Sequence, residues 1–258
     1  MTDKEQQRPA ALVTGAANRL GLAFATALAD RGYDIALHYH HSTEQAQHQA
    51  ELIRNRGVRC ETFQFDLSDE DPACLIEQVY HRFPGLQVLI NSASAYHAGT
   101  IANTDRALLQ KQFSVNFFAP YLLSGSFAKQ VASGSIINIL DNKIAFQQYQ
   151  YGAYLMSKKA LAEFTKLAAM EFSPRIRVNG IAPGVVLPGE TRTGDYIDWR
   201  IQGIPLQRQG RVEDLIRAMN YLLDSDFVTG QILFVDGGEG MNHLGLNAEE
   251  YESGDKVE

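Results

Sequence analysis

Tyr154 and Lys158 stand four residues apart in a stretch whose pattern is typical of a helix. Side chains at this spacing lie on one helix face, so the phenol and the ammonium can share one site. A nearby positive charge favours the phenolate and would lower the pKa of the tyrosine from its usual ~10, which makes it a better proton donor near neutral pH. The plain alternative is a surface tyrosine beside a surface lysine, because the pattern is weak by itself.

Two other stretches give this pair a chemical context. Asp141 directly follows the apolar run 135–140, which predicts a carboxylate at the carboxyl end of a strand. Near the start of the chain, the apolar run 10–14 is followed at once by the glycine-containing turn 15–21 and a helical pattern. A strand, a tight turn and a helix in this order are the context that a dinucleotide-phosphate site requires.

The rest of the chain alternates between strand and helix patterns. We expect strands at 10–14, 34–39, 59–65, 86–91, 135–140, 177–182 and 231–235. Helices are expected up to residue 28, at 43–54 after a cap at Ser42 or Thr43, up to residue 82 after a cap at Ser68 or Asp69, at 104–130 with a break at Pro120, at 151–172 and at 212–223. The alternation predicts an α/β fold, a Rossmann-type doubly wound parallel sheet of about seven strands with helices on both faces.

One stretch, 185–209, has no clear periodicity and contains several glycines and prolines. A segment of that length inside a domain is more often a lid or a binding loop than a simple connection. The last predicted strand, 231–235, reads as a buried strand. We expect one domain over 1–258 with polar tails at 1–9 and 247–258.

The composition narrows the possible functions. A formal net charge of −7 and a pI near 5.5 argue against nucleic acid or an anionic membrane as the main partner. No apolar run approaches the ~18 residues of a membrane span, and the polar start lacks the apolar core of a signal peptide, so we expect a cytoplasmic protein. The two cysteines, Cys60 and Cys74, have no metal-ligand spacing, and no metal site is expected.

Together these pieces resemble the short-chain dehydrogenase/reductase family over residues 10–238. The family's glycine turn is similar to TGAANRLG at 14–21, and its tyrosine–lysine pair falls on Tyr154 and Lys158. Its structural asparagine matches Asn116, which by this resemblance would hold a water relay to Lys158. The resemblance implies a redox reaction of a small molecule with a nicotinamide cofactor.

The same resemblance implies a set of cofactor contacts at the strand ends. Asp66 would contact the adenine, and the implied cofactor-binding residues are Gly15, Asn18, Arg19, Leu20, Gly21, His40, His41, Ser42, Asp66, Leu67, Asn91, Ser92, Ala93, Tyr154, Lys158, Pro183, Gly184 and Val185. An enzyme that uses NAD normally carries an acidic residue after the second strand for the ribose hydroxyl. Residues 38–42 contain no acid, which favours NADPH. This chain also resembles the pteridine reductases, which carry an arginine for the 2′-phosphate of NADPH at the position of His41.

Two departures from the family pattern point to the substrate. The family's usual serine donates a hydrogen bond to a substrate carbonyl, but Asp141 stands at that position, and an ionised carboxylate only accepts. The second departure is Arg19 in the turn, in place of the middle glycine. Pteridine reductases and dihydromonapterin reductases resemble this chain at Arg19 and Asp141, and also at Ser94-Ala95-Tyr96 and at 38–42. The similarity implies the substrate-binding residues Arg19, Ser94, Tyr96, Asp141 and Tyr154, with Tyr96 stacked on a flat pterin.

We therefore expect NADPH-dependent reduction of a dihydropterin such as dihydromonapterin or dihydrobiopterin. In this interpretation Tyr154 donates the proton, Lys158 lowers its pKa and holds the nicotinamide ribose, and Asp141 positions Tyr154 or the pterin nitrogens. The alternatives are a reductase of 3-oxoacyl thioesters or small ketones and, without catalysis, an NADPH-binding sensor. The family also implies a homotetramer formed through the helices that begin near 104 and 151.

Each site assignment has a structural alternative. Arg19 can simply replace a glycine at the surface of the turn, Asp141 can be a helix or turn cap, and Tyr96 can be a core or rim aromatic. The histidines at 38, 40 and 41 can be solvated loop residues, because no metal-ligand spacing accompanies them.

Overall fold

The computed structural model describes residues 8–187 and 194–241, and this part of the chain forms the predicted parallel sheet. The predicted tail at 247–258 and most of the tail at 1–9 lie outside the described residues. The strands are β1 (Ala10–Val13), β2 (Asp34–Tyr39), β3 (Cys60–Gln64), β4 (Leu86–Asn91), β5 (Gly134–Ile139), β6 (Ile176–Pro183) and β7 (Ile232–Val235). They pair in parallel in the order β3-β2-β1-β4-β5-β6-β7, so the order reverses between β1 and β4, where ligands bind in sheets of this kind.

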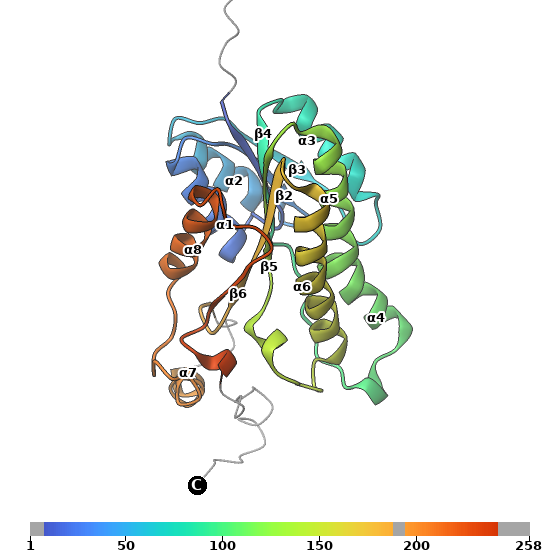
Figure 1. The fold of residues 1–258 in the computed structure, drawn as a ribbon, viewed down its shortest axis with the longest axis vertical. Helices are drawn as coiled ribbons and strands as arrows, with labels where there is room; N and C mark the ends of the chain where they lie inside the picture. The colour runs from blue at the N-terminus through green and yellow to red at the C-terminus, as the bar shows by residue number, and fades with distance from the viewer. Residues whose placement is uncertain (1–7, 188–193, 242–258) are drawn as a thin grey trace, which may run out of the picture.

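Helices cover both faces of the sheet, as Figure 1 shows. α1 (Arg19–Asp30), α2 (Thr43–Arg54) and α8 (Val212–Asp224) pack on one face, and α3 (Pro72–Arg82), α5 (Ala119–Gln130) and α6 (Gly152–Phe172) pack on the other. The side chains of β1 alternate between the two layers, because Leu12 belongs to one core cluster while Ala11 and Val13 belong to the other. The central strands are therefore apolar on both sides, as parallel strands usually are.

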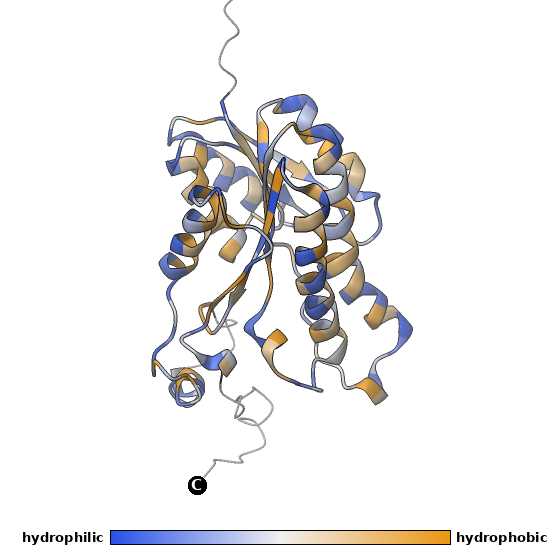
Figure 2. Ribbon diagram, in the orientation of Figure 1, coloured by the Kyte–Doolittle hydropathy of each residue, from blue (hydrophilic) through white to orange (hydrophobic). Residues whose placement is uncertain are grey.

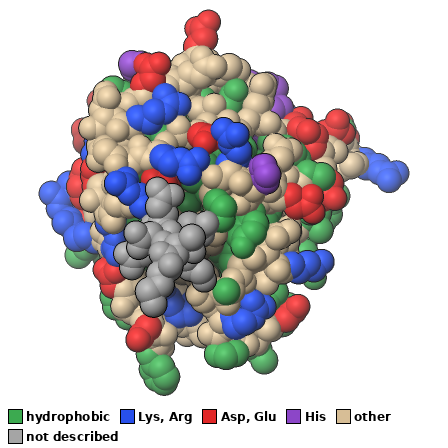
Figure 3. Space-filling view, turned by 90° about the horizontal axis from the view of Figure 1, so that it is seen from above, with side chains coloured by type: hydrophobic (Ala, Val, Ile, Leu, Met, Phe, Trp, Pro, Cys, Tyr) green, Lys and Arg blue, Asp and Glu red, His purple; other side chains and the backbone are tan. Residues whose placement is uncertain are grey.

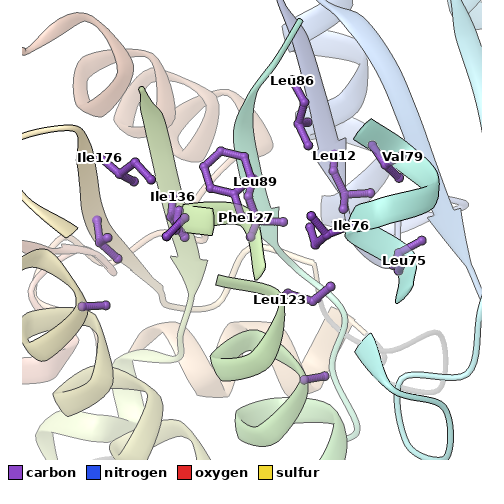
Figure 4. Packing of buried hydrophobic residues seen from close by; sticks show 14 of the residues in the cluster. Leu12, Leu75, Ile76, Val79, Leu86, Leu89, Leu123, Phe127, Ile136 and Ile176 are labelled. Atoms are coloured by element: carbon purple, nitrogen blue, oxygen red, sulfur yellow. The ribbon is translucent and has the colours of Figure 1, made fainter. Parts of the chain in front are cut away.

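The core between β4, β5 and the second helix layer is drawn in Figure 4. Leu89 and Ile136 from the strands meet Ile76 of α3 and Phe127 of α5, and all four side chains are fully buried. Burying a side chain of this size contributes roughly 1.5–3 kcal/mol. In Figure 2 the strands are mainly hydrophobic, while the helices carry polar residues on their outer sides. This packing holds the strand ends, and the loops that leave them, in fixed positions.

The helical stretch predicted at 104–130 is broken, as Pro120 indicates. α4 (Arg106–Phe113) is followed by the π-helical turn η2 (Ser114–Phe118), and α5 begins directly after it with Pro120 in its first turn. Proline fits there because the π-helical turn directly before it interrupts the regular α-helical hydrogen bonds, so its missing amide is tolerated. Single π-helical turns are rare and are frequent at functional sites, and Asn116 lies in the middle of this one.

The start of α3 differs from the prediction. The helix begins at Pro72, and the side chain of Asp71 caps it by accepting from the Ala73 amide at 3.0 Å. Ser68 lies four residues before the start of the helix, and its hydroxyl and amide both donate to Asp66. The caps predicted at Ser68 and Asp69 are therefore wrong, and the residues before the helix form a loop at the end of β3.

Two further elements were not predicted correctly. The helix α7 (Gly194–Ile201) lies inside the aperiodic stretch 185–209 and is too short to give a periodic signal. The strand β7 is only partly buried, although its apolar run predicts a buried strand. Because β7 is the edge strand of the sheet, its outer side has no neighbouring strand in the described chain.

The described helices include none that is both long and apolar enough to cross a membrane. Figure 3 looks onto the end of the molecule where the strands begin, and there side chains of Lys and Arg are interspersed with those of Asp and Glu. Among the described residues no cluster of three or more potential metal ligands is present.

Candidate active site

A cleft of about 860 Å³ opens at the carboxyl ends of the strands, across the point where the strand order reverses. Its volume lies within the usual range of ligand pockets. Most of the predicted site residues line it: Gly15, Asn18, Arg19, Leu20, Gly21, His40, His41, Asp66, Leu67, Ser92, Ala93, Ser94, Tyr96, Asp141, Tyr154, Lys158, Pro183, Gly184 and Val185. Ser42, Asn91 and Asn116 do not line it. Ser42 precedes α2 without a side-chain cap bond, and Asn91 is buried and donates to Asn138.

The glycine turn is packed so closely that its glycines cannot be replaced without movement. Gly15 has φ 64°, and a Cβ placed on it would lie 2.9 Å from the Cα of Ala93. A Cβ on Gly21 would lie 2.3 Å from the Gly15 carbonyl oxygen. The turn leads into α1, whose first residues line the cleft and have no side-chain cap, so the amides there can bind an anion.

Arg19 crosses from the turn to the segment that follows β6. Its guanidinium donates to the carbonyl oxygen of Leu187 at 2.5 Å, and its backbone has φ 51°, a conformation in which glycine is the usual residue. The side chain is thus held at the rim of the cleft by a specific contact. This contact joins two segments that are distant in the sequence, which a simple surface substitution for glycine would not do.

His38 is not a solvated loop residue. It lies in β2, is almost fully buried, and its Nδ1 accepts from the Gly15 amide at 3.0 Å while Nε2 lies 3.0 Å from the Phe65 carbonyl oxygen. A ring that accepts at Nδ1 must carry its proton on Nε2, so His38 is neutral. Burial lowers the pKa of His38 to about 4, which agrees with this assignment. The histidine ties the glycine turn to the strand beside it.

His40 and His41 lie at the end of β2, where the acid-free segment was noted in the sequence. Their rings are 3.4 Å apart between centroids, and Nε2 of His40 lies 3.1 Å from Oδ2 of Asp66. Burial acts to raise the pKa of Asp66, but the hydrogen bonds from Ser68 and the charge of His40 outweigh it and lower that pKa. The carboxylate of Asp66 therefore stays ionised, and it neighbours two groups that can carry positive charge.

Tyr154 and Asp141 meet at the end of β5. The hydroxyl of Tyr154 donates to Oδ2 of Asp141 at 2.8 Å, and Oδ1 of Asp141 accepts from the Lys143 amide at 2.9 Å. Asp141 is thus a turn cap and a partner of Tyr154 at the same time, which combines two interpretations that the sequence left as alternatives. Since the carboxylate is fixed at both oxygens, it orients the phenol.

The expectation that Lys158 lowers the pKa of Tyr154 is wrong. Burial and the adjacent carboxylate of Asp141 raise the pKa of Tyr154 well above its ordinary value. The ammonium of Lys158 lies 5.9 Å from the Tyr154 ring and donates instead to the Ile139 carbonyl oxygen at 2.8 Å. Burial lowers the pKa of Lys158 itself to about 8, against the opposing charge of Asp141. Burial and the close carboxylate therefore act in the same direction on Tyr154, and the ammonium, which is engaged with Ile139, does not reverse it.

Tyr96 belongs to a group of tyrosines at the mouth of the cleft. Its ring stacks on Tyr151 with centroids 4.5 Å apart and meets the edge of Tyr154 at 4.7 Å. The ammonium of Lys143 lies 5.7 Å from the Tyr96 centroid and 5.2 Å from that of Tyr151. Tyr96 is 39% exposed, so it is a rim aromatic that lines the cleft and not a core residue.

Asn116 lies behind the cleft and connects three segments. Its amide group donates to the Ala95 carbonyl at 2.8 Å and to the Ser157 hydroxyl at 3.1 Å, and its oxygen accepts from the Ala95 amide and from Ser94. The side chain therefore fixes the segment after β4 against α6. The water relay from Asn116 to Lys158, which the family resemblance implies, stays a prediction.

Several cleft residues were missed by the sequence analysis. Lys143 and Asn142 follow Asp141, and Tyr196 and Arg200 come from α7, inside the stretch that gave no periodic signal. Lys143 offered no signal, because a lysine in a loop is usually a solvated residue. The pair Tyr196 and Arg200 has the i, i+4 spacing of one helix face, but the short helix around it was not recognised.

Comparison with known proteins gives the family. The family profile described as "Enoyl-(Acyl carrier protein) reductase" matches residues 15–239. Pteridine reductase 1 of Leishmania tarentolae is 32% identical over 277 residues, which cover 89% of this chain and 96% of that protein. A 3-oxoacyl-[acyl-carrier-protein] reductase FabG of Staphylococcus epidermidis is 28% identical, with coverages of 88% and 97%.

Solved structures give the same picture. FolM alternative dihydrofolate reductase 1 of Brucella suis, crystallised in complex with NADP, superposes with a TM-score of 0.86. It is 31% identical, and the match covers 90% of this chain and 95% of that one. Acetoin dehydrogenase YohF of Salmonella typhimurium superposes with a TM-score of 0.84 at 29% identity, with coverages of 93% and 99%.

Proposed function

Because the chain belongs to the short-chain dehydrogenase/reductase family, we propose that it is the member that reduces dihydropterins with NADPH. The hydrogen bond from Tyr154 to Asp141 carries this proposal. In a ketone reductase of this kind, a second donor beside the tyrosine stabilises the oxygen on which negative charge develops. Here that neighbour is an acceptor, which suits a substrate that offers N–H groups. A pterin ring has such groups at its edge.

The chain is an oxidoreductase whose cofactor is NADPH, which supplies a hydride when it is bound. The residues of the cleft fit this cofactor. The tight packing around Gly15 and Gly21 leaves the backbone of the turn free of side chains, and the start of α1 can bind the pyrophosphate. His40 and His41 stand at the end of β2, where a carboxylate would repel a 2′-phosphate.

In the proposed reaction Tyr154 holds the proton that the reduced ring nitrogen receives. Its raised pKa keeps the phenol protonated throughout the neutral range, so the proton is present when the substrate binds. In this proposal an N–H of the pterin edge takes the place of the Tyr154 hydroxyl at Asp141, and the hydroxyl then turns its proton from the carboxylate to the ring nitrogen. Lys158 supports the site with its positive charge, and its ammonium is held by a hydrogen bond to the Ile139 carbonyl oxygen.

The second candidate is reduction of a 3-oxoacyl thioester. The similarity to the FabG reductase and the description of the matching family profile favour it. Asp141 argues against it, because the developing alkoxide would face a carboxylate instead of a donor.

Steady-state oxidation of NADPH separates the two candidates. We expect turnover with a dihydropterin and none above background with an acetoacetyl thioester. Asp141→Ser should lower pterin turnover at least tenfold, since the charged acceptor for the pterin N–H and the carboxylate that orients the phenol are replaced by a neutral hydroxyl. Asp226→Ser, the same change at an exposed aspartate outside the cleft, should leave turnover unchanged. Thioester reduction by the wild type, without pterin reduction, would refute the proposal.

We also infer that the protein works as a homotetramer in the cytoplasm. α5 and α6 lie side by side and expose the large apolar side chains Phe118, Tyr121, Leu167 and Met170 just before or along these two helices. Apolar groups gathered on adjacent helices are typical of an interface between protein copies.

A further inference from the structure

Four buried polar side chains meet next to the carboxyl end of β5 and connect three short segments of the chain. They are Asn142 of η3 (Asn142–Ala145), Arg200 of α7, Asp236, and Glu239 of η4 (Glu239–Met241), and each is less than a tenth exposed. One carboxylate oxygen of Glu239 pairs with Arg200, and the other accepts from Asn142 at 2.8 Å.

This group is unfavourable to bury unless it serves a purpose. Removing two charges from water costs free energy, and a buried ion pair is often no more stabilising than apolar side chains of the same size. A purely structural tie between α7 and η4 would therefore not need charged groups. The second carboxylate oxygen of Glu239, which contacts Asn142 and not Arg200, points to a further role.

Asn142 directly follows Asp141, so the place of Asn142 helps to decide where Asp141 lies. On the other side of Asp141, the amide of Leu140 donates to the Ile181 carbonyl oxygen at 2.7 Å and fixes that neighbour on the sheet. After Asp141 the chain leaves the sheet in the four-residue turn η3, whose own backbone bonds are 3.1 and 3.2 Å long. The bond from Asn142 to Glu239 anchors this turn, and Asp141 thus stands between two anchored residues.

Asp236 holds Glu239 itself in place. It follows β7, and its carboxylate accepts from the amides of Gly238 at 2.9 Å and Gly240 at 2.6 Å, which flank Glu239. η4 also packs closely on η3, because a Cβ added to Gly240 would lie 3.4 Å from the Cβ of Ala145. Glu239 therefore offers Asn142 an acceptor in a fixed position.

We propose that Glu239 is a positioning residue, which acts through Asn142 to hold the carboxylate of Asp141 beside the hydroxyl of Tyr154. Arg200 balances the charge of Glu239 and leaves its other oxygen for Asn142. Glu239 does not line the cleft, so it acts on the reaction only through other residues. This role rests on the use of Asp141 in the proposed function but not on the identity of the substrate.

Two double variants separate the link to Asn142 from the ion pair. Both carry Arg200→Met, which removes the buried positive charge, and they differ in having Glu239→Gln or Glu239→Met. The Gln variant keeps an oxygen for Asn142, whereas the Met variant does not. We expect kcat to be roughly tenfold lower with Met than with Gln, because a small displacement of a reacting group has an effect of this order. The dissociation constant of NADPH should be the same in both.

A matched pair of variants controls for the substitution itself. Glu213→Gln and Glu213→Met, at an exposed position of α8 outside the cleft, should have the same kcat. Equal kcat values for the two Glu239 variants would overturn the proposal.

A further substitution shows whether Glu239 acts through Asp141. With Asp141→Ser added, the carboxylate that Glu239 holds is gone, so the Gln and Met variants should share one low kcat. If Met still lowers kcat tenfold relative to Gln in this background, Glu239 supports the fold and not Asp141, and the proposed role fails.

Hydrogen exchange follows the turn without any turnover. The amide of Lys143 donates to Oδ1 of Asp141 at 2.9 Å, and we expect it to exchange roughly tenfold faster in the Met variant than in the Gln variant. Equal exchange would contradict the role of Glu239. Should the Met variant not fold, Asn142→Ala removes the donor of the same bond, and it should show the same losses of kcat and protection against the wild type.

The outcomes also keep the two proposals apart. If the wild type reduces only the thioester, the proposed function fails, and kcat for the thioester decides the role of Glu239. If it reduces neither substrate, the exchange of the Lys143 amide decides. If it reduces the dihydropterin while the two variants agree in kcat and in exchange, the function stands and only the role of Glu239 fails.

Discussion

Lys158 is a fully buried ammonium, and burial of its charge is unfavourable for folding. The pKa of about 8 expresses this cost, because the unfolded chain binds the proton of this lysine up to a pKa near 10.5 and the folded chain releases it earlier. Below pH 8 the lysine is charged in both states, so the full cost is present at neutral pH. Between pH 8 and 10.5 the cost declines as pH rises.

Lys158→Met is therefore expected to stabilise the protein while it abolishes turnover. The free energy of unfolding in urea at pH 7 should rise by up to about 3 kcal/mol, and this gain should shrink by about 1 kcal/mol at pH 9. Lys166→Met on the exposed side of the same helix is the matched control and should change stability little. A variant that is less stable than the wild type at pH 7 would show that the ammonium contributes more through Ile139 than its burial costs.

The sequence identified the reacting residues but not the sign of their interaction. Tyr154, Lys158 and Asp141 stand at recognisable places relative to helix and strand patterns, and all three line one cleft. The pKa of Tyr154 depends first on how deeply its hydroxyl is buried and then on how close the carboxylate of Asp141 lies. Both are a matter of a few ångströms between side chains of separate elements, which periodicity and spacing do not determine.

The link between β2 and the glycine turn depends on a neutral imidazole. His38 accepts from the Gly15 amide through Nδ1, and a protonated ring could not accept there. The folded state therefore resists protonation, and its pKa of about 4 lies below the 6.5 of a free histidine. Between pH 6.5 and 4 the unfolded chain binds a proton that the folded chain does not. The stabilisation is thus complete above pH 6.5 and is lost as pH falls toward 4.

The hydrogen bond between the Gly15 amide and His38 is therefore sensitive to acid, and it lies next to the cofactor site. Between pH 7 and 4 the free energy of unfolding should fall by about 3 kcal/mol more in the wild type than in His38→Gln, whose amide can replace both ring nitrogens without titrating. His48→Gln, at an exposed position on α2, should keep the wild-type slope. Equal pH slopes for His38→Gln and the wild type in urea titrations would mean that His38 does not titrate as described.

At the scale of elements, the long and regular pieces were predictable and the short ones were not. Seven of the eight described α-helices, with α4 and α5 both inside the stretch 104–130, and all seven described strands fall in predicted segments, and their ends differ from the prediction mostly by one or two positions. α7 has only eight residues and gave no periodic signal, whereas Asp71 followed by Pro72 was a readable start signal for α3 that the prediction passed over. Pro120 marked the break in the stretch 104–130, but a π-helical turn cannot be told from a kink by sequence pattern.

At the scale of the whole molecule, α5 and α6 expose apolar side chains that no other described helix covers. Along α6, Leu167 is 65% exposed and Met170 80% exposed, and α5 lies beside this helix. With a net charge of −7, copies of the chain repel one another at long range, so association requires a contact of this apolar kind.

Light scattering during size exclusion is expected to give about four times the chain mass of 28.6 kDa. Leu167→Glu should lower that mass, because a carboxylate would be buried against apolar side chains at the contact. Lys166→Glu introduces the same carboxylate one position earlier on the same helix and tests whether charge alone causes the change. A measured mass of 28.6 kDa for the wild type would contradict the proposed homotetramer.

The π-helical turn Ser114–Phe118 restricts how this chain can change in length during evolution. Deleting one residue from it would restore a regular helix and rotate α5 by about 100° relative to α4. Either Leu123 and Phe127 would then leave the core, or Asn116 would turn away from Ala95 and Ser157. Substitutions can accumulate around this turn, but insertions and deletions within it disturb the core and the active site together. Its length is therefore inherited more strictly than its sequence.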